Sequence, residues 1–130
     1  MNFPSKLNYD TVLSYANKNC RPFNLQETMR QMRFPLPIVY FCWGAHAFTR
    51  FGEDQCLRFK VNGHKHSGHV YIFLAGNDTY TVAFSTTRGR VLHYVEGIFC
   101  EQLQFLIDQY VESLGAEYSV QRWGMKEPEK

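Results

Sequence analysis

The chain has 130 residues and a formal net charge of +2, with 14 Lys and Arg against 12 Asp and Glu. This length accommodates one domain around one core, and an apolar fraction of 45% excludes an intrinsically disordered chain. The aromatic fraction of 16% is high and favours β-strands. We expect a single domain over residues 1–130, with residues 1–7 and 118–130 as partly frayed termini.

The N-terminus and the apolar runs of the sequence indicate the cellular compartment, and with it the state of the cysteines. No apolar leader precedes them, because the first ten residues are mostly polar. The longest nearly apolar run, residues 38–45, is far shorter than the roughly 20 residues that a membrane-spanning helix needs. We therefore expect a cytoplasmic protein with no membrane segment, no cofactor and free thiols at its cysteines. These are Cys20, Cys42, Cys56 and Cys100.

Two helices are predicted near the N-terminus, over residues 9–18 and 25–33. Asn8 is a suitable N-cap for the first helix. Asn24 is a suitable N-cap for the second, and Glu27 three residues later completes the pattern of a capping box. The prolines that follow end the second helix, because proline has no amide hydrogen to donate.

The middle of the chain predicts strands. Residues 38–43 and 46–51 are rich in β-branched and aromatic side chains, and Gly44 between them indicates a bulge or a sharp bend. Alternating side chains and intervening turns predict further strands, over residues 57–61, 70–75, 79–85 and 90–95. The strand 70–75 is apolar on both faces, which is typical of a central strand. Short turns join successive strands, so we expect an antiparallel meander of four or five strands.

An amphipathic helix closes the pattern, with apolar residues at spacings of three and four from Phe99 to Leu114 and Gly115 as its stop. Its polar side chains are expected to face outward: Glu101, Gln104, Asp108 and Glu112. The order of elements predicts an α+β fold, with N-terminal helices, an antiparallel four- or five-stranded meander and a C-terminal amphipathic helix packed on the sheet.

Charge is distributed unevenly along the chain. Residues 1–95 carry 11 basic and five acidic residues, whereas residues 96–117 carry five acidic residues and no basic ones. The acidic helix is either a surface that keeps the protein in solution or a contact surface for a basic partner protein. The second hypothesis assigns protein binding to three acids, Glu101, Asp108 and Glu112.

A histidine cluster, His64, His66 and His69, lies where a hairpin turn is expected. Imidazole is a common metal ligand, so these residues are the weak candidates for a metal site. No carboxylate or thiolate stands near them at a recognisable spacing, and zinc usually takes four ligands. A hairpin tip with solvated histidines is therefore the favoured interpretation, and no metal is expected.

An alternative function is the binding of single-stranded nucleic acid through one face of the sheet. Arg58 and Lys60 lie on one predicted strand, and Tyr71 and Phe73 lie on the next. If the four share an exposed face, the cations can contact phosphates and the rings can stack on bases. The competing interpretation is that a helix covers both rings as part of the core, with Arg58 and Lys60 at its margin.

No group of residues in the sequence predicts catalysis. Cys42 and His46 form the nearest thiol–imidazole pair, but four residues of extended strand span about 13 Å, too far for a hydrogen bond. The chain has no paired CxxC motifs, no phosphate-binding glycine loop and no nucleophile elbow. We expect a protein that is not an enzyme and that works by binding a protein partner.

Three stretches of the chain resemble small uncharacterised proteins encoded by phages and mobile elements of gut bacteria. They are QMRFPLPIVYFCWGAHAF, FKVNGHKHSGHVYIFLAGNDTYTVAFSTTRG and VEGIFCEQLQFLIDQYVE. The resemblance implies an accessory or host-takeover protein that binds a host or element protein, for example as an inhibitor of a bacterial defence system. It carries over no functional residue. A homodimer is also compatible with the sequence, because a meander leaves edge strands that can pair with a second copy.

Overall fold

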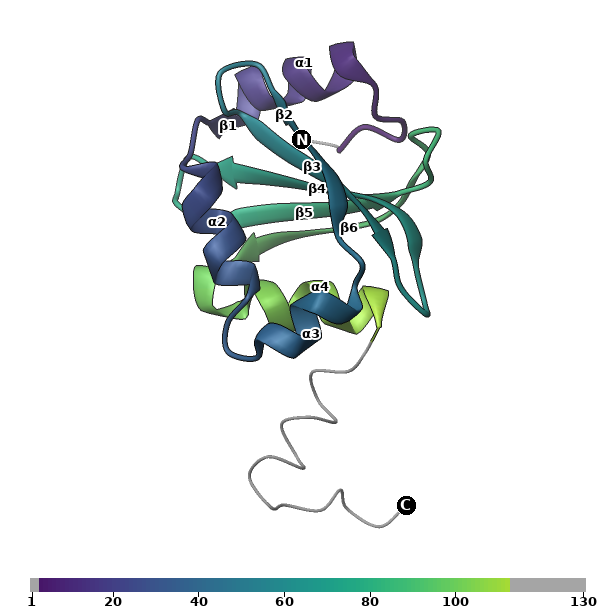
Figure 1. Ribbon diagram of the computed structural model, residues 1–130. Coiled ribbons are helices and arrows are strands. Elements are labelled where there is room, and N and C mark those ends of the chain that lie inside the picture. Colours follow the sequence, from purple (N-terminus) through teal and green to yellow (C-terminus); the bar gives the residue numbers. More distant parts are fainter. Residues whose placement is uncertain (1–2, 113–130) are drawn as a thin grey trace, which may run out of the picture.

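The computed structural model describes residues 3–112, and Figure 1 labels their helices and strands. In chain order these are α1 (Tyr9–Asn19), β1 (Cys20–Arg21), α2 (Leu25–Met32), α3 (Pro37–Cys42), β2 (His46–Phe51), β3 (Cys56–Asn62), β4 (Ser67–Ala75), β5 (Tyr80–Ser85), β6 (Val91–Ile98), the 3-10 helix η1 (Cys100–Gln102) and α4 (Leu103–Val111). Strands β2 to β6 pair in that order, each antiparallel to the next, and β1 pairs with the end of β4. The predicted α+β fold with an antiparallel meander is confirmed.

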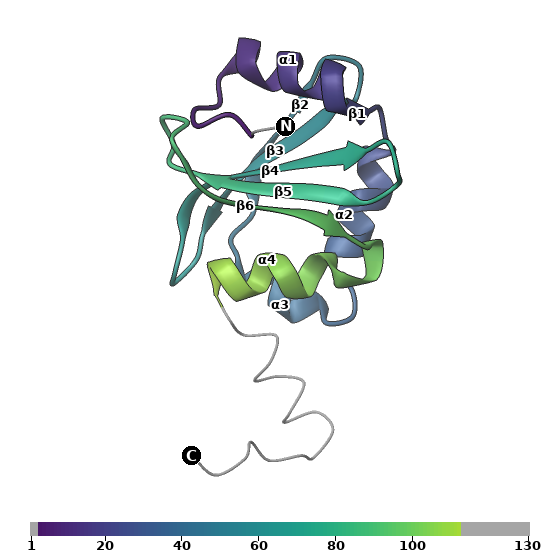
Figure 2. The ribbon, with the colours of Figure 1, turned by 180° about the vertical axis from the view of Figure 1, so that it is seen from behind.

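Helices cover both faces of the sheet, as Figures 1 and 2 show from opposite sides. Helix α1 lies over one face, here called the α1 face, and α2, α3 and α4 lie over the other, here called the α4 face. The central strand β4 explains this arrangement. Val70 and Ile72 point to the α4 face, Tyr71 and Phe73 point to the α1 face, and none is more than 2% exposed. Because neither side of β4 is suited to water, the sheet needs a layer on each side.

The C-terminal helix packs on the sheet, as predicted. Leu103, Ile107 and Val111 are fully buried in the same cluster as apolar residues of β3, β4 and β5. The hairpin between β3 and β4 holds the end of α4. The backbone N–H of Lys65 donates to the carbonyl oxygen of Val111, and its Nζ donates to the carbonyl oxygen of Gln109, both at 2.8 Å. These donors satisfy carbonyls that have no partner within the helix.

The prediction that Gln104 and Asp108 face outward is wrong, because neither is more than 3% exposed. Helix α3 and the residues around it lie against this side of α4 and supply polar partners. The Asp108 Oδ1 accepts a hydrogen bond from Trp43 Nε1 at 3.0 Å. The Gln104 side chain accepts from the N–H of Leu36 at 3.2 Å and donates to the carbonyl oxygens of Met32 and Leu36 at 2.8 and 2.9 Å. Buried polar groups are stable when they are paired in this way.

The prediction of a strand over residues 38–43 is also wrong, because this segment forms α3. Pro37 occupies the first turn, where its missing N–H has no helical partner to lose. The buried side chains around α3 recur at helical spacings of three and four: Leu36, Val39, Tyr40 and Trp43. Gly44 has a φ of +65° and ends the helix, whereas the sequence predicted that it would bend a strand. The irregularity nearest to Gly44 lies instead in β2, between His46 and Thr49, and β5 and β6 also pair with shifts of register.

The two N-terminal helices begin where the sequence predicts. Asn8 Oδ1 accepts from the N–H of Thr11 at 2.9 Å, and Asn24 Oδ1 accepts from the N–H of Glu27 at 3.0 Å. The complete capping box belongs to α1, because the N–H of Asn8 also donates to Thr11 Oγ1 at 2.8 Å. In α2 the Glu27 carboxylate accepts instead from Arg30, at 2.6 Å.

The N-terminal segment, predicted to be frayed over residues 1–7, is packed from residue 3 onward. Phe3 and Leu7 are buried in the cluster under α1. The N–H of Leu7 donates to the carbonyl oxygen of Gly89 at 2.7 Å. Gly89 has a φ of +98°, and a Cβ there would lie 2.2 Å from the Leu7 carbonyl oxygen, so only glycine allows this close approach.

Other sequence-based predictions concern the helix boundaries and the C-terminus. Phe99, expected on the buried stripe, lies before η1 and is more than half exposed. Leu114, Gly115 and the segment 118–130 lie outside the described residues. Within residues 3–112, no helix has the length and apolar character to cross a membrane.

The cysteines are free, as predicted: Cys20 is partly buried, Cys56 is buried, and Cys42 and Cys100 are exposed. Burial raises the pKa of Cys56 well above its usual value. Its thiol therefore stays protonated and acts as a small apolar group in the core.

The Gln104 contacts give a testable prediction about stability. Gln104→Ala removes three buried hydrogen bonds, among them those to the N–H of Leu36 and the carbonyl oxygen of Met32. We expect the free energy of unfolding, measured by urea denaturation, to fall by about 2–4 kcal/mol. Glu101→Ala, on the exposed surface just before α4, is the control and is expected to change it by less than about 0.5 kcal/mol. Equal effects of the two substitutions would contradict the role given to Gln104.

Candidate functional site

The outer side of α3, α4 and their flanking residues carries a group of large apolar side chains. Each is at least half exposed. We call this group the aromatic face; its members are Phe34, Ile38, Phe41, Phe99 and Phe105. Helices α3 and α4 contact each other and lie along the same edge of the molecule (Figures 1 and 2), so their outward sides form one surface.

The aromatic face exists because α3 is apolar around its whole circumference. The helix buries one side through Val39 and Tyr40, which leaves Ile38 and Phe41 on the opposite side. A helix of this kind is normally enclosed by protein on all sides. Phe41 is instead 69% exposed, the highest value among the large apolar residues of the described chain. Exposed apolar patches of this kind mark interaction surfaces more often than single exposed residues do.

A shallow pocket lies within the aromatic face, where the end of α2 meets η1. Its volume is about 340 Å³, and most of its lining is apolar. The lining residues are Gln31, Phe34, Pro35, Cys100 and Glu101. A side chain of a partner protein could enter this pocket and contact Phe34 on one wall.

The thiol at the edge of this pocket is not an activated nucleophile. The Cys100 Sγ donates a hydrogen bond to Glu101 Oε2 at 3.3 Å. This hydrogen bond raises the pKa of Cys100. Because only the thiolate attacks an electrophile, Cys100 is less reactive than a free cysteine. It contributes to the lining of the pocket.

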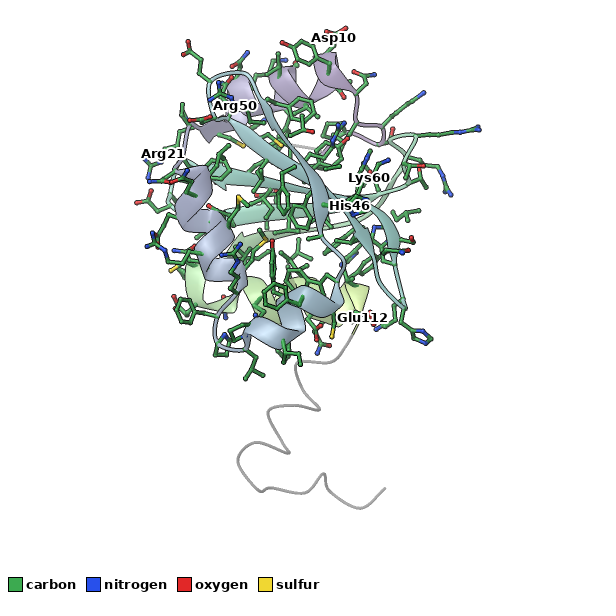
Figure 3. The ribbon with its side chains drawn as sticks, viewed as in Figure 1. Asp10, Arg21, His46, Arg50, Lys60 and Glu112 are labelled. Carbon is green, nitrogen blue, oxygen red and sulfur yellow. The ribbon has the colours of Figure 1, made fainter. Side chains whose placement is uncertain are left out.

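The three acids predicted to bind a protein partner do not lie together on the surface. Glu101 is exposed and lines the pocket. Glu112 is half-buried at the end of α4, and Figure 3 shows it at the lower edge of the molecule. Asp108 is fully buried against Trp43, so its assignment to the contact surface is wrong. Of the three predicted acids, only Glu101 and Glu112 therefore contribute negative charge to the surface.

The predicted platform for single-stranded nucleic acid is half correct. Arg58 pairs with Tyr71 across β3 and β4, so these two strands do place Arg58, Lys60, Tyr71 and Phe73 on one face. That face is the α1 face, and both rings are buried beneath α1 in contact with its apolar side. Bases cannot stack on rings that a helix covers. The proposed stacking platform is therefore wrong, and the alternative interpretation of a covering helix is confirmed.

The histidine cluster is divided between different environments. His64 is exposed, but His66 and His69 are buried, so the prediction of solvated histidines is wrong for these two. The His66 ring contacts Tyr110 of α4, whereas the His69 ring contacts Tyr71 on the α1 face. Among residues 3–112, no group of three or more His, Cys, Asp or Glu residues is placed to hold a metal ion.

The sequence contained a pattern that indicates the aromatic face, but it was interpreted with the periodicity of a strand instead of that of a helix. Between residues 36 and 43, the run LPIVYFCW fits both a strand, by its composition, and a helix, by the spacing of its buried residues. As a strand, this run would have placed Ile38 in the sheet with its neighbours on alternating sides. As a helix, it places Ile38 and Phe41 together on the surface.

Comparison of the chain with protein-family models, with curated proteins and with solved structures finds no match in any of the three. A function for this protein is therefore best inferred from its surfaces. The aromatic face and its pocket are the surface with the most exposed apolar side chains in the described chain.

The difference between the two sides of α4 is open to measurement. Ile107→Ala removes a fully buried side chain, and we expect it to lower the free energy of unfolding by about 2–4 kcal/mol. Phe105→Ala, two residues earlier on the exposed side, is expected to lower it by less than about 1 kcal/mol. Both values come from urea denaturation monitored by circular dichroism. A loss at Phe105 as large as that at Ile107 would mean that the aromatic face is part of the core.

The buried His69 gives a prediction for the dependence of stability on pH. Burial, together with the charges of Arg58, Lys60 and His66, lowers the pKa of His69 from 6.5 to about 4. The unfolded chain therefore binds a proton between these two pH values that the folded chain does not bind. This contribution to stability is complete above pH 6.5 and is lost as the pH falls toward 4.

We expect the wild-type protein to lose about 1–3 kcal/mol more stability than His69→Gln between pH 7 and pH 4. Urea denaturation at a series of pH values measures this difference. His64→Gln, which changes an exposed histidine, is the control and is expected to follow the wild type. Parallel pH profiles for wild type and His69→Gln would contradict the lowered pKa of His69.

Proposed function

We propose that this protein is a non-enzymatic binding protein that docks on a partner protein through its aromatic face. The observation that carries this proposal is the exposure of five large apolar side chains along the outer side of α3, η1 and α4. Covering one such side chain contributes roughly 1.5–3 kcal/mol. Aromatic residues are also enriched among the residues that dominate binding energy at interfaces.

The chemistry of the surface indicates the chemistry of the partner. Glu101 lines the pocket beside Phe34, and Glu112 lies at the other end of α4. Between residues 96 and 112 the chain has no Lys or Arg. A complementary partner has apolar side chains that fill the pocket and contact the phenylalanines, surrounded by Lys or Arg.

The sequence resemblance to proteins of phages and mobile elements of gut bacteria suggests where such a partner occurs. We infer a bacterial protein, encoded by the host or by the element itself, and a component of a defence system is a candidate of this kind. A basic surface is common on proteins that handle nucleic acid, which fits such a component.

Site-specific photo-crosslinking in living cells tests the proposal and identifies the partner in the same experiment. A photoreactive phenylalanine analogue replaces Phe41 or Phe105 in the full chain, which is expressed in a gut bacterium and irradiated. We expect both positions to give one common adduct, identified by mass spectrometry. The control position is Tyr9 on α1, which is 63% exposed on the opposite side of the sheet and is expected to give none.

Two further variants strengthen the test. Phe41→Ser together with Phe105→Ser is expected to remove an adduct formed from position 34, while thermal unfolding changes by no more than a few degrees, because neither side chain is buried. Tyr9→Ser is expected to leave the adduct unchanged. A partner captured equally from position 9, an adduct only with a second copy of this chain, or no adduct from either position would overturn the proposal.

A further inference from the structure

A second group of polar and basic side chains lies on the α1 face of the sheet, partly exposed and partly buried. The pairing of β2, β3, β4 and β5 aligns one residue from each strand in a single row across the α1 face. We call it the cross-sheet row: His46, Lys60, His69 and Ser85. Figure 3 shows the labelled His46 and Lys60 beside each other on neighbouring strands. Arg58 lies two residues before Lys60 on β3, with its side chain on the same face.

The two cations at this row, Arg58 and Lys60, are not neutralised by carboxylates. Within the described chain, the ion pairs of Lys and Arg residues join Arg21 to Asp78, Arg30 to Glu27 and Arg50 to Asp54. Neither Arg58 nor Lys60 has a carboxylate within ion-pairing distance among residues 3–112. Arg58 lies instead over the Phe51 ring, with its carbon Cζ 5.3 Å from the ring centre.

Further positive charge surrounds the row. The turn after Ser85 contains Arg88 and Arg90, and Lys6 pairs with Arg90 through a backbone bridge. All three side chains are exposed. A group of cations with no paired acid raises the local potential and attracts anions.

Two buried polar atoms at this site have no hydrogen-bond partner. They are the Nε of Arg58 and the Nδ1 of His69, and the His69 residue is only 6% exposed. A buried polar atom without a partner costs about 1–3 kcal/mol, so such atoms are rare in folded proteins. The hydroxyl groups of Tyr71 and Ser85 interact with each other beside them, and Tyr71 also interacts with Arg58. The site therefore combines two unpartnered nitrogen atoms, hydroxyl groups and cations.

We propose that Arg58, Lys60 and His69 form a binding site for a phosphate group. A phosphate offers several acceptor oxygens and a charge of up to two, which matches two cations and an unpaired imidazole nitrogen better than a single carboxylate does. Lys60 and His46 are exposed, Arg58 is partly buried and His69 is buried. The phosphate belongs either to a small phosphate ester or to a nucleic-acid backbone, and the two sources share this chemistry.

Titration of the full chain with inorganic pyrophosphate tests the site, with sodium chloride at the same ionic strength as the reference. We expect saturable binding by isothermal calorimetry, together with a shift of the His69 ring nitrogen resonances in nuclear magnetic resonance spectra. Lys60→Gln changes an exposed side chain and is expected to weaken binding about tenfold. Arg50→Gln is the matched control on β2, because Arg50 is already paired with Asp54, and it is expected to change affinity less than about twofold.

A second arm identifies the source of the phosphate. Tighter binding of a short thymidine oligonucleotide than of pyrophosphate, with the same dependence on Lys60, indicates a nucleic-acid backbone. Equal or tighter binding of pyrophosphate indicates a small phosphate ester.

An absence of saturable binding by both probes would overturn the proposal. So would equal losses in the Lys60 and Arg50 variants, or a crystal structure with ordered waters on both unpaired atoms and no bound phosphate in pyrophosphate-soaked crystals. Because these variants leave the aromatic face unchanged, the outcome is independent of the proposed protein partner.

Discussion

The two-sided apolar character of β4 is the constraint from which the rest of the structure follows. Val70 and Ile72 require cover on one face of the sheet, and Tyr71 and Phe73 require it on the other. A domain of this size meets both requirements only by using all its helices, three on one face and one on the other. The cover is unequal as a result. The thicker layer of α2, α3 and α4 has an outer surface of its own, whereas the single helix α1 covers the other face together with Phe3 and Leu7.

The polar contacts between α3 and α4 decide which side chains reach the surface. Asp108 and Gln104 are held inside by Trp43 and by the backbone around Leu36, and these bonds orient both helices. Once α4 is oriented in this way, Phe105 points outward although it belongs to an apolar helix. The helix is therefore amphipathic in an unusual sense, because some of its polar side chains are buried and one of its largest apolar side chains is exposed.

The two surfaces of the molecule differ in chemistry. On the outer side of the helical layer, phenylalanines lie with acidic residues, whereas on the α1 face, Lys and Arg lie with hydroxyl and imidazole groups. Such a separation of charge gives the molecule an electric dipole, and it favours different ligands on opposite sides. It also means that changes on one surface can be made without disturbing the other, since the whole thickness of the sheet lies between them.

Local patterns in the sequence determined most of the fold. Asn8 and Asn24 predicted the starts of two helices, and the alternation in residues 57–61 and 70–75 predicted the antiparallel strands, because capping and side-chain period depend only on neighbouring residues. Only the tertiary structure decided the helical state of residues 37–42, the burial of Asp108 and Gln104, and the cover over Tyr71 and Phe73. Each depends on a partner far along the chain, such as Trp43 for Asp108 or α1 for the two rings. Periodicity states that a face is apolar or polar, but the element that packs against it decides whether that face is buried.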